Sequence, residues 1–147
     1  MREPYQILSI PYRIINDEPL FCIFHRDDSC YWQFIAGGGE NGEKPVEAAK
    51  RESVEEIGIE PNNIKKLTCI AYIPTEVIAE SKREHWDKKT FVIPEYSFAF
   101  ECYSEPILSD EHSEYKWLTY DDARKLLKWD SNKVAMYELN CILRNKK

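Results

Sequence analysis

Three glutamates in the segment RESVEEIGIE have a spacing that allows them to act together. Glu52, Glu55 and Glu56 stand three and four positions apart. Residues of an α-helix advance by about 100° each, so side chains at this spacing share one face. Like charges at i and i+4 destabilise an isolated helix by about 0.2–0.5 kcal/mol per pair, whereas carboxylate oxygens are preferred ligands of Mg²⁺. The spacing therefore predicts an exposed carboxylate face, which is either simply solvated or binds a metal ion.

The helix that carries these glutamates is expected over residues 45–57. Pro45 suits its first turn, and Gly58 is placed to end it. A second stripe of the same helix is mostly apolar and is expected to pack on a sheet. This stripe contains Val46, Ala49, Ser53 and Ile57.

The rest of the chain alternates between strand and helix patterns. Strands are expected over residues 5–15, 20–24, 31–36, 64–73, 96–103 and 115–120. Thr119 and Asp122 resemble a capping box for a second helix, and Ser131 can cap a third whose inner face is Ala135, Leu139 and Ile142. This order predicts an α/β fold, a mixed β-sheet sandwiched between α-helices, in one domain over residues 1–147. The long segment 75–95 is a candidate substrate-recognition loop.

The segment GGGENGEKPVEAAKRESVEEIGIE matches one family pattern in register. From Gly37 it reads G-x5-E-x7-R-E-x2-E-E-x-G, which resembles the Nudix box at every required position. Ser53 stands where the family has an apolar residue, and Ala36 replaces a proline common before the box. Both departures leave the carboxylates in place. The order of elements also resembles the Nudix fold.

The resemblance implies a role for each matching residue. Glu52, Glu55 and Glu56 would hold Mg²⁺, with Mn²⁺ as a substitute, helped by a backbone carbonyl near Ala36 or Gly37. Glu43 and Arg51 would form an ion pair that braces the loop and helix. Implied catalytic residues are Glu55, Glu56, Glu111 and Arg51, with Glu111 as a further metal ligand and Glu114 as its competitor. Gly37, Glu43 and Gly58 would be structural.

Three further segments, HRDDSCYWQ, EHSEYKWL and KWDSNKVAMYELN, resemble the branch of dihydroneopterin triphosphate and deoxynucleoside triphosphate pyrophosphatases. That branch implies substrate contacts from Arg2, His25, Arg26, Ala36, Gly37 and Trp86. A surface ion pair of Arg26 with Asp27 or Asp28 is an equal alternative. Trp32 and Tyr72 could stack on a ring, but their predicted strands favour the core.

The resemblance predicts a Nudix pyrophosphohydrolase that converts a nucleoside or pterin triphosphate to a monophosphate and pyrophosphate. Alternatives are a dinucleoside polyphosphate or nucleotide-sugar hydrolase, or a non-catalytic module that senses a nucleotide. Modules of the last kind usually lack box glutamates, which are all present here, so an enzyme is favoured.

The composition limits the binding partners and the cellular compartment that we expect for this protein. The net charge of −6 argues against a large nucleic acid, because phosphate neutralisation needs a basic surface. No apolar run approaches the ~20 residues that span a bilayer, so no membrane contact is expected. Five scattered cysteines suggest reduced thiols in a cytoplasmic protein. A homodimer is compatible with the sequence.

Overall fold

The computed structural model of the protein describes residues 1–145. The described chain runs through β1 (Arg2–Ile15), β2 (Glu18–Arg26), β3 (Trp32–Gln33), β4 (Ile35–Glu40), α1 (Pro45–Ile57), β5 (Lys65–Pro74), a short 3-10 turn (Thr75–Val77), α2 (Glu80–Arg83), β6 (Val92–Glu101), β7 (His112–Leu118), α3 (Tyr120–Leu126) and α4 (Asp130–Arg144).

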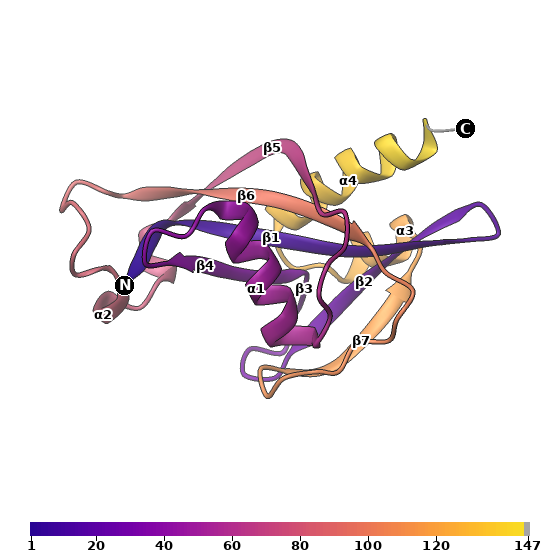
Figure 1. Cartoon of the computed structure of the whole chain (residues 1–147), viewed down its shortest axis with the longest axis horizontal. Helices are drawn as coiled ribbons and strands as arrows, with labels where there is room; N and C mark the ends of the chain where they lie inside the picture. Colours follow the sequence, from indigo (N-terminus) through magenta and orange to yellow (C-terminus); the bar gives the residue numbers. More distant parts are fainter. Residues whose placement is uncertain (146–147) are drawn as a thin grey trace.

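The strands form one mixed sheet whose centre is β1 (Figure 1). Its path is β3-β2-β1-β6-β5, while β4 pairs with the first half of β1 and β7 pairs with β2. The β1–β6 pair is parallel, and the other strand pairs are antiparallel. Strand β1 thus joins β4, which precedes α1, to β6. Strand β6 begins at Val92, so the last residues of the predicted 75–95 loop are part of a strand.

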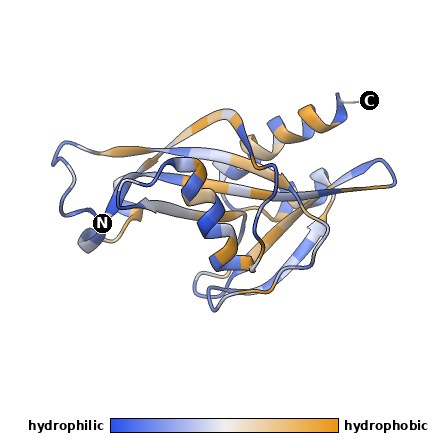
Figure 2. Cartoon of the chain, in the orientation of Figure 1, coloured by the Kyte–Doolittle hydropathy of each residue, from blue (hydrophilic) through white to orange (hydrophobic). Residues whose placement is uncertain are grey.

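Helices cover both faces of this sheet. Successive side chains on a strand point to opposite faces. Ile7 belongs to a buried cluster with Ala48 and Ala49 of α1, whereas its neighbour Leu8 belongs to another with Ala135 of α4. Figure 2 shows apolar residues along the central strands and polar residues at the outer loops. The predicted α/β fold with a mixed sheet between helices is confirmed.

The region around the glycines differs from the predicted pattern. The single strand expected over 31–36 is two strands, β3 and β4, and the second continues through the three glycines as far as Glu40. Those glycines therefore lie in an extended edge strand and not in a turn. β1 supplies their antiparallel partner, with Ile7 opposite Gly37 and Gln6 opposite Gly38. Sequence patterns had shown only the absence of side chains, which is typical of turns.

Helix α1 spans residues 45–57, as predicted. Glu47 accepts a hydrogen bond from the Lys44 backbone N–H at 2.9 Å, and Gly58 ends the helix in the left-handed conformation at φ 69°. Glycine adopts that conformation at the lowest cost, because it has no Cβ. The first turn is therefore held by an acceptor that meets the unpaired N–H groups, and the last by a residue without a Cβ.

Helix α4 departs from the prediction at both ends. It begins at Asp130, so Ser131 lies inside the first turn and is not its cap. Ile142 is exposed, and Leu143 is the buried residue at that end. Tyr72, expected in the core, is exposed on β5, which is an edge strand. Within residues 1–145 no helix is long and apolar enough to cross a membrane.

Candidate active site

The three glycines of β4 allow side chains to lie directly against the strand. A Cβ built on Gly37 would overlap the carboxylate of Glu52, one on Gly38 would overlap the guanidinium of Arg2, and one on Gly39 would overlap the Tyr5 ring. Any larger residue would displace these groups. The glycines therefore allow a helix carboxylate on one face of β4 and an arginine on the other to lie against the strand backbone.

Arg51 holds the glutamates of α1 in place. Its guanidinium donates to both carboxylate oxygens of Glu43, at 2.9 and 3.0 Å, and to the Gly38 carbonyl at 2.8 Å. It also donates to Glu52 and Glu55, each at 3.1 Å. The bond from Arg51 lowers the pKa of Glu43, and Glu43 is the largest cause raising the pKa of Arg51. The Glu43–Arg51 ion pair implied by the resemblance is present.

Glu56 does not lie on an exposed face, contrary to the sequence expectation. The residue is only 3% exposed, and neither carboxylate oxygen has a hydrogen-bond partner among residues 1–145. Burial raises its pKa well above the usual value, and the charge of nearby Glu52 raises it further. Burial is also the main cause that raises the pKa of Glu52. The substitution Glu56→Gln is therefore a change in a buried side chain.

His112 lies beside Glu56 without compensating its charge. Its Nε2 is 3.6 Å from Glu56 Oε1, which exceeds hydrogen-bond distance. Burial, followed by the charge of Arg26, lowers the pKa of His112 to about 4, so the ring is neutral near pH 7. Glu56 is thus left without positive charge or a donor from this side.

The carboxylates around Glu56 suit a divalent cation. Oxygen ligands with negative charge are those that Mg²⁺ and Mn²⁺ prefer, and orphaned buried carboxylate oxygens need such a partner. In the described residues, no three His, Cys, Asp or Glu side chains are yet gathered into a metal-binding group. The physical reason is Arg51, which draws Glu52 and Glu55 toward its own guanidinium. Binding would require Glu55 to turn away from Arg51 toward Glu52 and Glu56, whose carboxyl groups already interact with each other.

Glu111, and not Glu114, acts electrostatically on the buried carboxylate of Glu56. Its charge is among the causes that raise the pKa of Glu56. The segment before it is fastened to the end of α1, because the Ser109 N–H donates to the Glu56 carbonyl at 3.0 Å. Glu114 instead lies exposed on β7, opposite His25. The geometry favours Glu111 as the carboxylate supplied from outside α1.

His25 and Arg26 of β2, which were predicted to contact the substrate, form contacts with other side chains of the protein. Arg26 donates to both oxygens of Asp28, at 3.1 and 2.9 Å, and lies 3.9 Å from Glu111. The surface pair with Asp28, considered as an alternative, is therefore present. His25 Nδ1 lies 2.9 Å from the Ser113 hydroxyl. Because Arg26 also lowers the pKa of Glu56, it remains within electrostatic range of the acidic cluster.

The remaining predicted substrate residues gather at the start of β1. Arg2 donates to Gln6 Oε1 at 2.6 Å, and its buried Nε has no acceptor in the described structure. Trp86, from the 75–95 segment, donates its indole N–H to the Arg2 carbonyl at 2.7 Å. Ala36 is half-buried opposite Leu8. The structure thus brings Arg2, Trp86 and the glycine strand together, and it leaves Arg26 beside Glu111 and His25 opposite Glu114.

Comparison with protein-family models shows the family of this chain. The model of the NUDIX domain matches residues 14–139. The chain belongs to the NUDIX domain family. We therefore call residues 37–59, which carry the family pattern, the Nudix box, and α1 the Nudix helix.

Similar proteins of known structure or name agree with this assignment. A solved structure described as a NUDIX hydrolase from Listeria monocytogenes is 41% identical, with a TM-score of 0.83 over 97% of this chain and 96% of that one. The dihydroneopterin triphosphate diphosphatase of Escherichia coli (strain K12) is 26% identical over 137 residues, 92% of this chain and 91% of that protein. The asymmetrical bis(5'-nucleosyl)-tetraphosphatase of Sus scrofa is 31% identical over 108 residues, covering 74% and 69%. The protein is a Nudix hydrolase homologue of enzymes that act on phosphoric anhydrides.

Two polar residues that hold α1 and α4 against the sheet were missed by sequence reasoning. Ser53, noted as the irregular letter of the box, lies 3.1 Å from buried Ser9 of β1 and donates to the Ala49 carbonyl at 2.8 Å. The Ser53 hydroxyl, at a position that packs on the sheet, is therefore paired with the hydroxyl of Ser9. Asn132 of α4 is buried and accepts from the Phe34 N–H at 2.9 Å. Neither pairing leaves a local signal, because the partners lie far apart in sequence.

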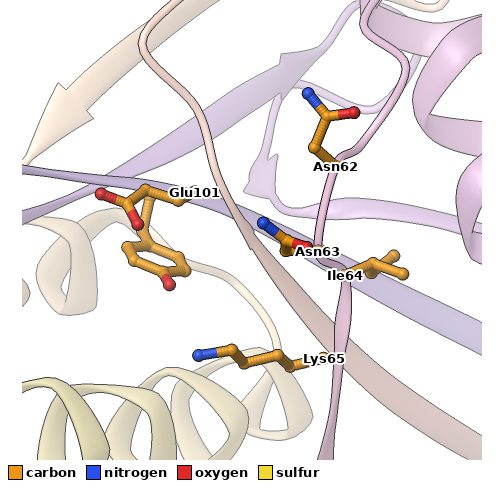
Figure 3. Close-up of a pocket in the computed structure, with 6 residues that line it drawn as sticks. Asn62, Asn63, Ile64, Lys65 and Glu101 are labelled. Carbon is orange, nitrogen blue, oxygen red and sulfur yellow. The ribbon is translucent and has the colours of Figure 1, made fainter.

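Two surface hollows lie away from the Nudix glutamates. The hollow in Figure 3 has a volume of about 460 Å³ and lies where β5 begins. It is lined by Tyr12, Asn62, Asn63, Ile64, Lys65 and Glu101. A second, of about 520 Å³, is lined by Asp121, Arg124, Lys125 and Lys133. No box glutamate contributes to either lining, so neither is the centre of the chemistry.

Proposed function

We propose that this Nudix protein is a Mg²⁺-dependent pyrophosphohydrolase that converts a nucleoside or pterin triphosphate to a monophosphate and pyrophosphate. The observation that carries the proposal is the buried, unpartnered carboxylate of Glu56 beside Glu52. A purely structural role would leave two buried oxygens without any compensation. The similarity to the Escherichia coli protein named dihydroneopterin triphosphate diphosphatase supports the triphosphate class.

Four carboxylates would hold the cation. Glu56 provides a buried carboxylate and Glu52 a half-buried one, and Glu55 and Glu111 provide exposed oxygens. When bound, Mg²⁺ or Mn²⁺ neutralises phosphate charge and lowers the pKa of a bound water that can attack phosphorus. The role of Arg51 is to orient Glu52 and Glu55, since its guanidinium also fixes the loop through Glu43.

Two arginines provide the positive charge that a triphosphate needs. Arg26 is half-buried beside Glu111, and Arg2 presents an unused Nε next to Gly38 in the described structure. A guanidinium binds phosphate oxygens in a bidentate manner. The protein is acidic overall, so these side chains give local positive charge to an otherwise repulsive site. The role of His25 would be a contact beside Arg26.

A second candidate is an asymmetrical dinucleoside tetraphosphatase. The similarity to the Sus scrofa protein of that name, at 31% identity, is the specific reason to retain it. Its substrate carries the same phosphoanhydride chain, so the Nudix carboxylates would serve both reactions. The two candidate substrates differ in the group at the far end of the phosphate chain, and a panel of substrates distinguishes the two activities.

The test is a substrate panel with Mg²⁺ that scores pyrophosphate against orthophosphate release. It contains dihydroneopterin triphosphate, each deoxynucleoside triphosphate, an oxidised guanine nucleotide and diadenosine tetraphosphate. We expect pyrophosphate and monophosphate from a triphosphate, and loss of turnover in EDTA or in Glu52→Gln. Glu60→Gln is the matched control, because Glu60 is exposed just beyond the helix. Binding without turnover across the panel would instead indicate a sensing module.

A further inference from the structure

A second buried carboxylate lies outside the Nudix box. Glu95 of β6 is only 5% exposed, and its Oε1 has no hydrogen-bond partner in the part of the chain that the structure describes. Burial raises its pKa, and a hydrogen bond with Ser131 opposes that effect. An orphaned, buried oxygen of this kind is costly unless a ligand satisfies it. The residue is therefore a candidate for ligand recognition.

Strand register places Glu95 level with the glycine strand. Gln6 of β1 is paired with Gly38 on one side and with Glu95 on the other. Neighbouring strands lie about 4.8 Å apart, so roughly 10 Å separates the Gly38 and Glu95 backbones. This is a length that a sugar and a ring can span. Glu95 thus lies where the far end of a substrate would be if its phosphates were near Gly38.

The same face of the sheet is only partly covered in this region. Leu8 packs with Ala135 of α4, and Gln6 and Glu95 share its face by strand alternation and register. Gln6 and Ala71, the neighbours of Glu95 in the cross-strand row, are half-buried. Arg2 bonds Gln6 at 2.6 Å, which joins the row to the phosphate end. A ring that approaches this row from the glycine edge would meet Arg2 and Gln6 before it reaches Glu95.

The start of α4 favours an ionised Glu95. Ser131 stands in the first turn of α4, whose N-terminal N–H groups and dipole favour negative charge. Asn132 and Trp129 hold this turn against β3 and β4, through bonds to Phe34 at 2.9 Å and Gln33 at 3.2 Å. An ionised carboxylate only accepts hydrogen bonds. Burial disfavours this ionised form and the Ser131 hydrogen bond favours it; when Glu95 is ionised, its unpartnered Oε1 can accept an N–H donor from a ligand.

We propose that Glu95 selects the ring of the substrate by accepting hydrogen bonds from the ring N–H and amino group of a 2-amino-4-oxo ring, as in guanine and pterin. This edge presents two adjacent donors, one for the unpartnered Oε1 of Glu95 and one for the remaining lone pair of its second oxygen. Adenine presents a donor beside an acceptor lone pair, which would face a carboxylate oxygen unfavourably. The inference rests on the proposed triphosphate function and names the class of ring within it.

The test compares kcat/KM for dGTP, dihydroneopterin triphosphate and dATP in the wild type, Glu95→Gln and Glu95→Ala. A bidentate base contact contributes a discrimination of about 5- to 150-fold. We expect both variants to lose that factor on dGTP and the pterin substrate and to keep their activity on dATP. Retained dATP activity shows that the variants fold. Glu101→Gln, an exposed change on the same strand, is the matched control.

Equilibrium binding of GMP and AMP separates this proposal from the proposed function. Calorimetric titration does not require turnover, so it applies even if no triphosphate is hydrolysed. We expect wild type to bind GMP more tightly and Glu95→Gln to lose the difference. Equal binding of GMP and AMP by wild type, an adenine preference that depends on Glu95, or an equal loss on every ligand would overturn the assignment.

Discussion

Replacing Glu56 by Gln should stabilise the metal-free protein while it abolishes activity. Both oxygens of this buried carboxylate lack partners among the described residues. An unsatisfied buried polar group costs about 1–3 kcal/mol, and a charged one costs more. Glutamine brings an N–H donor, and the neutral His112 ring lies 3.6 Å from the carboxylate oxygen that it replaces. We expect the free energy of unfolding to rise by about 1–3 kcal/mol near pH 8 in EDTA.

Thermal unfolding followed by calorimetry or circular dichroism measures this effect. For a chain of this size, 1 kcal/mol corresponds to a Tm change of about 2–4 °C. Because the folded pKa of Glu56 is raised, the folded protein binds this proton more tightly than the unfolded chain does. Its contribution to stability is therefore fully present below the unfolded carboxyl pKa of about 4.3 and is lost as pH rises through the folded value. Glu56→Gln should remove that decline.

Activity and metal response complete the test. We expect kcat/KM of Glu56→Gln to fall by about 10²-fold or more, since even the groups that support metal ligands contribute 10- to 100-fold. Added Mg²⁺ should raise the Tm of wild type and leave the variant almost unchanged. The exposed Glu60→Gln serves as the control for both measurements. A variant that melts below wild type in EDTA, or that keeps wild-type turnover, would refute the reasoning.

Two further substitutions test the supporting residues. Glu111→Gln should lower kcat at least 10-fold with an unchanged Tm, because this side chain is exposed and its ion pair with Arg26 is long, at 3.9 Å. The same loss in Glu114→Gln alone would assign the role to Glu114. Asn132→Ala leaves the buried Phe34 N–H without its acceptor, so we expect a loss of about 1–3 kcal/mol in urea unfolding. A stability equal to wild type would mean that water replaces the amide at no cost.

Local patterns were sufficient for the Nudix helix. Pro45, the glutamate spacing and Gly58 each act within a few residues of one another, and the helix begins and ends where they predict. The ion pair of Arg51 with Glu43 also followed from a motif of fixed spacing. Motif residues near one another in sequence keep their geometry because the helix itself sets it.

Contacts between distant segments decided the exposure of individual side chains. Glu52, Glu55 and Glu56 share a face, yet only Glu56 is buried, because the segment of residues 107–112 packs over the end of the helix. Contacts between segments also explain the exposure of Tyr72. Its predicted strand favoured the core, but the strand lies at the edge of the sheet. Periodicity gives the relative directions of side chains, and it does not say what covers them.

The sequence by itself determined the family chemistry of this protein, namely a helix of spaced carboxylates, an arginine that pairs with them and three glycines before them. Only the tertiary structure decided which carboxylate lies buried without a partner, and it alone placed Glu95 level with Gly38 through the parallel pairing of β1 and β6. The physical reason is range. Helix geometry acts over a few residues, whereas burial and strand register depend on segments that meet only after the chain has folded.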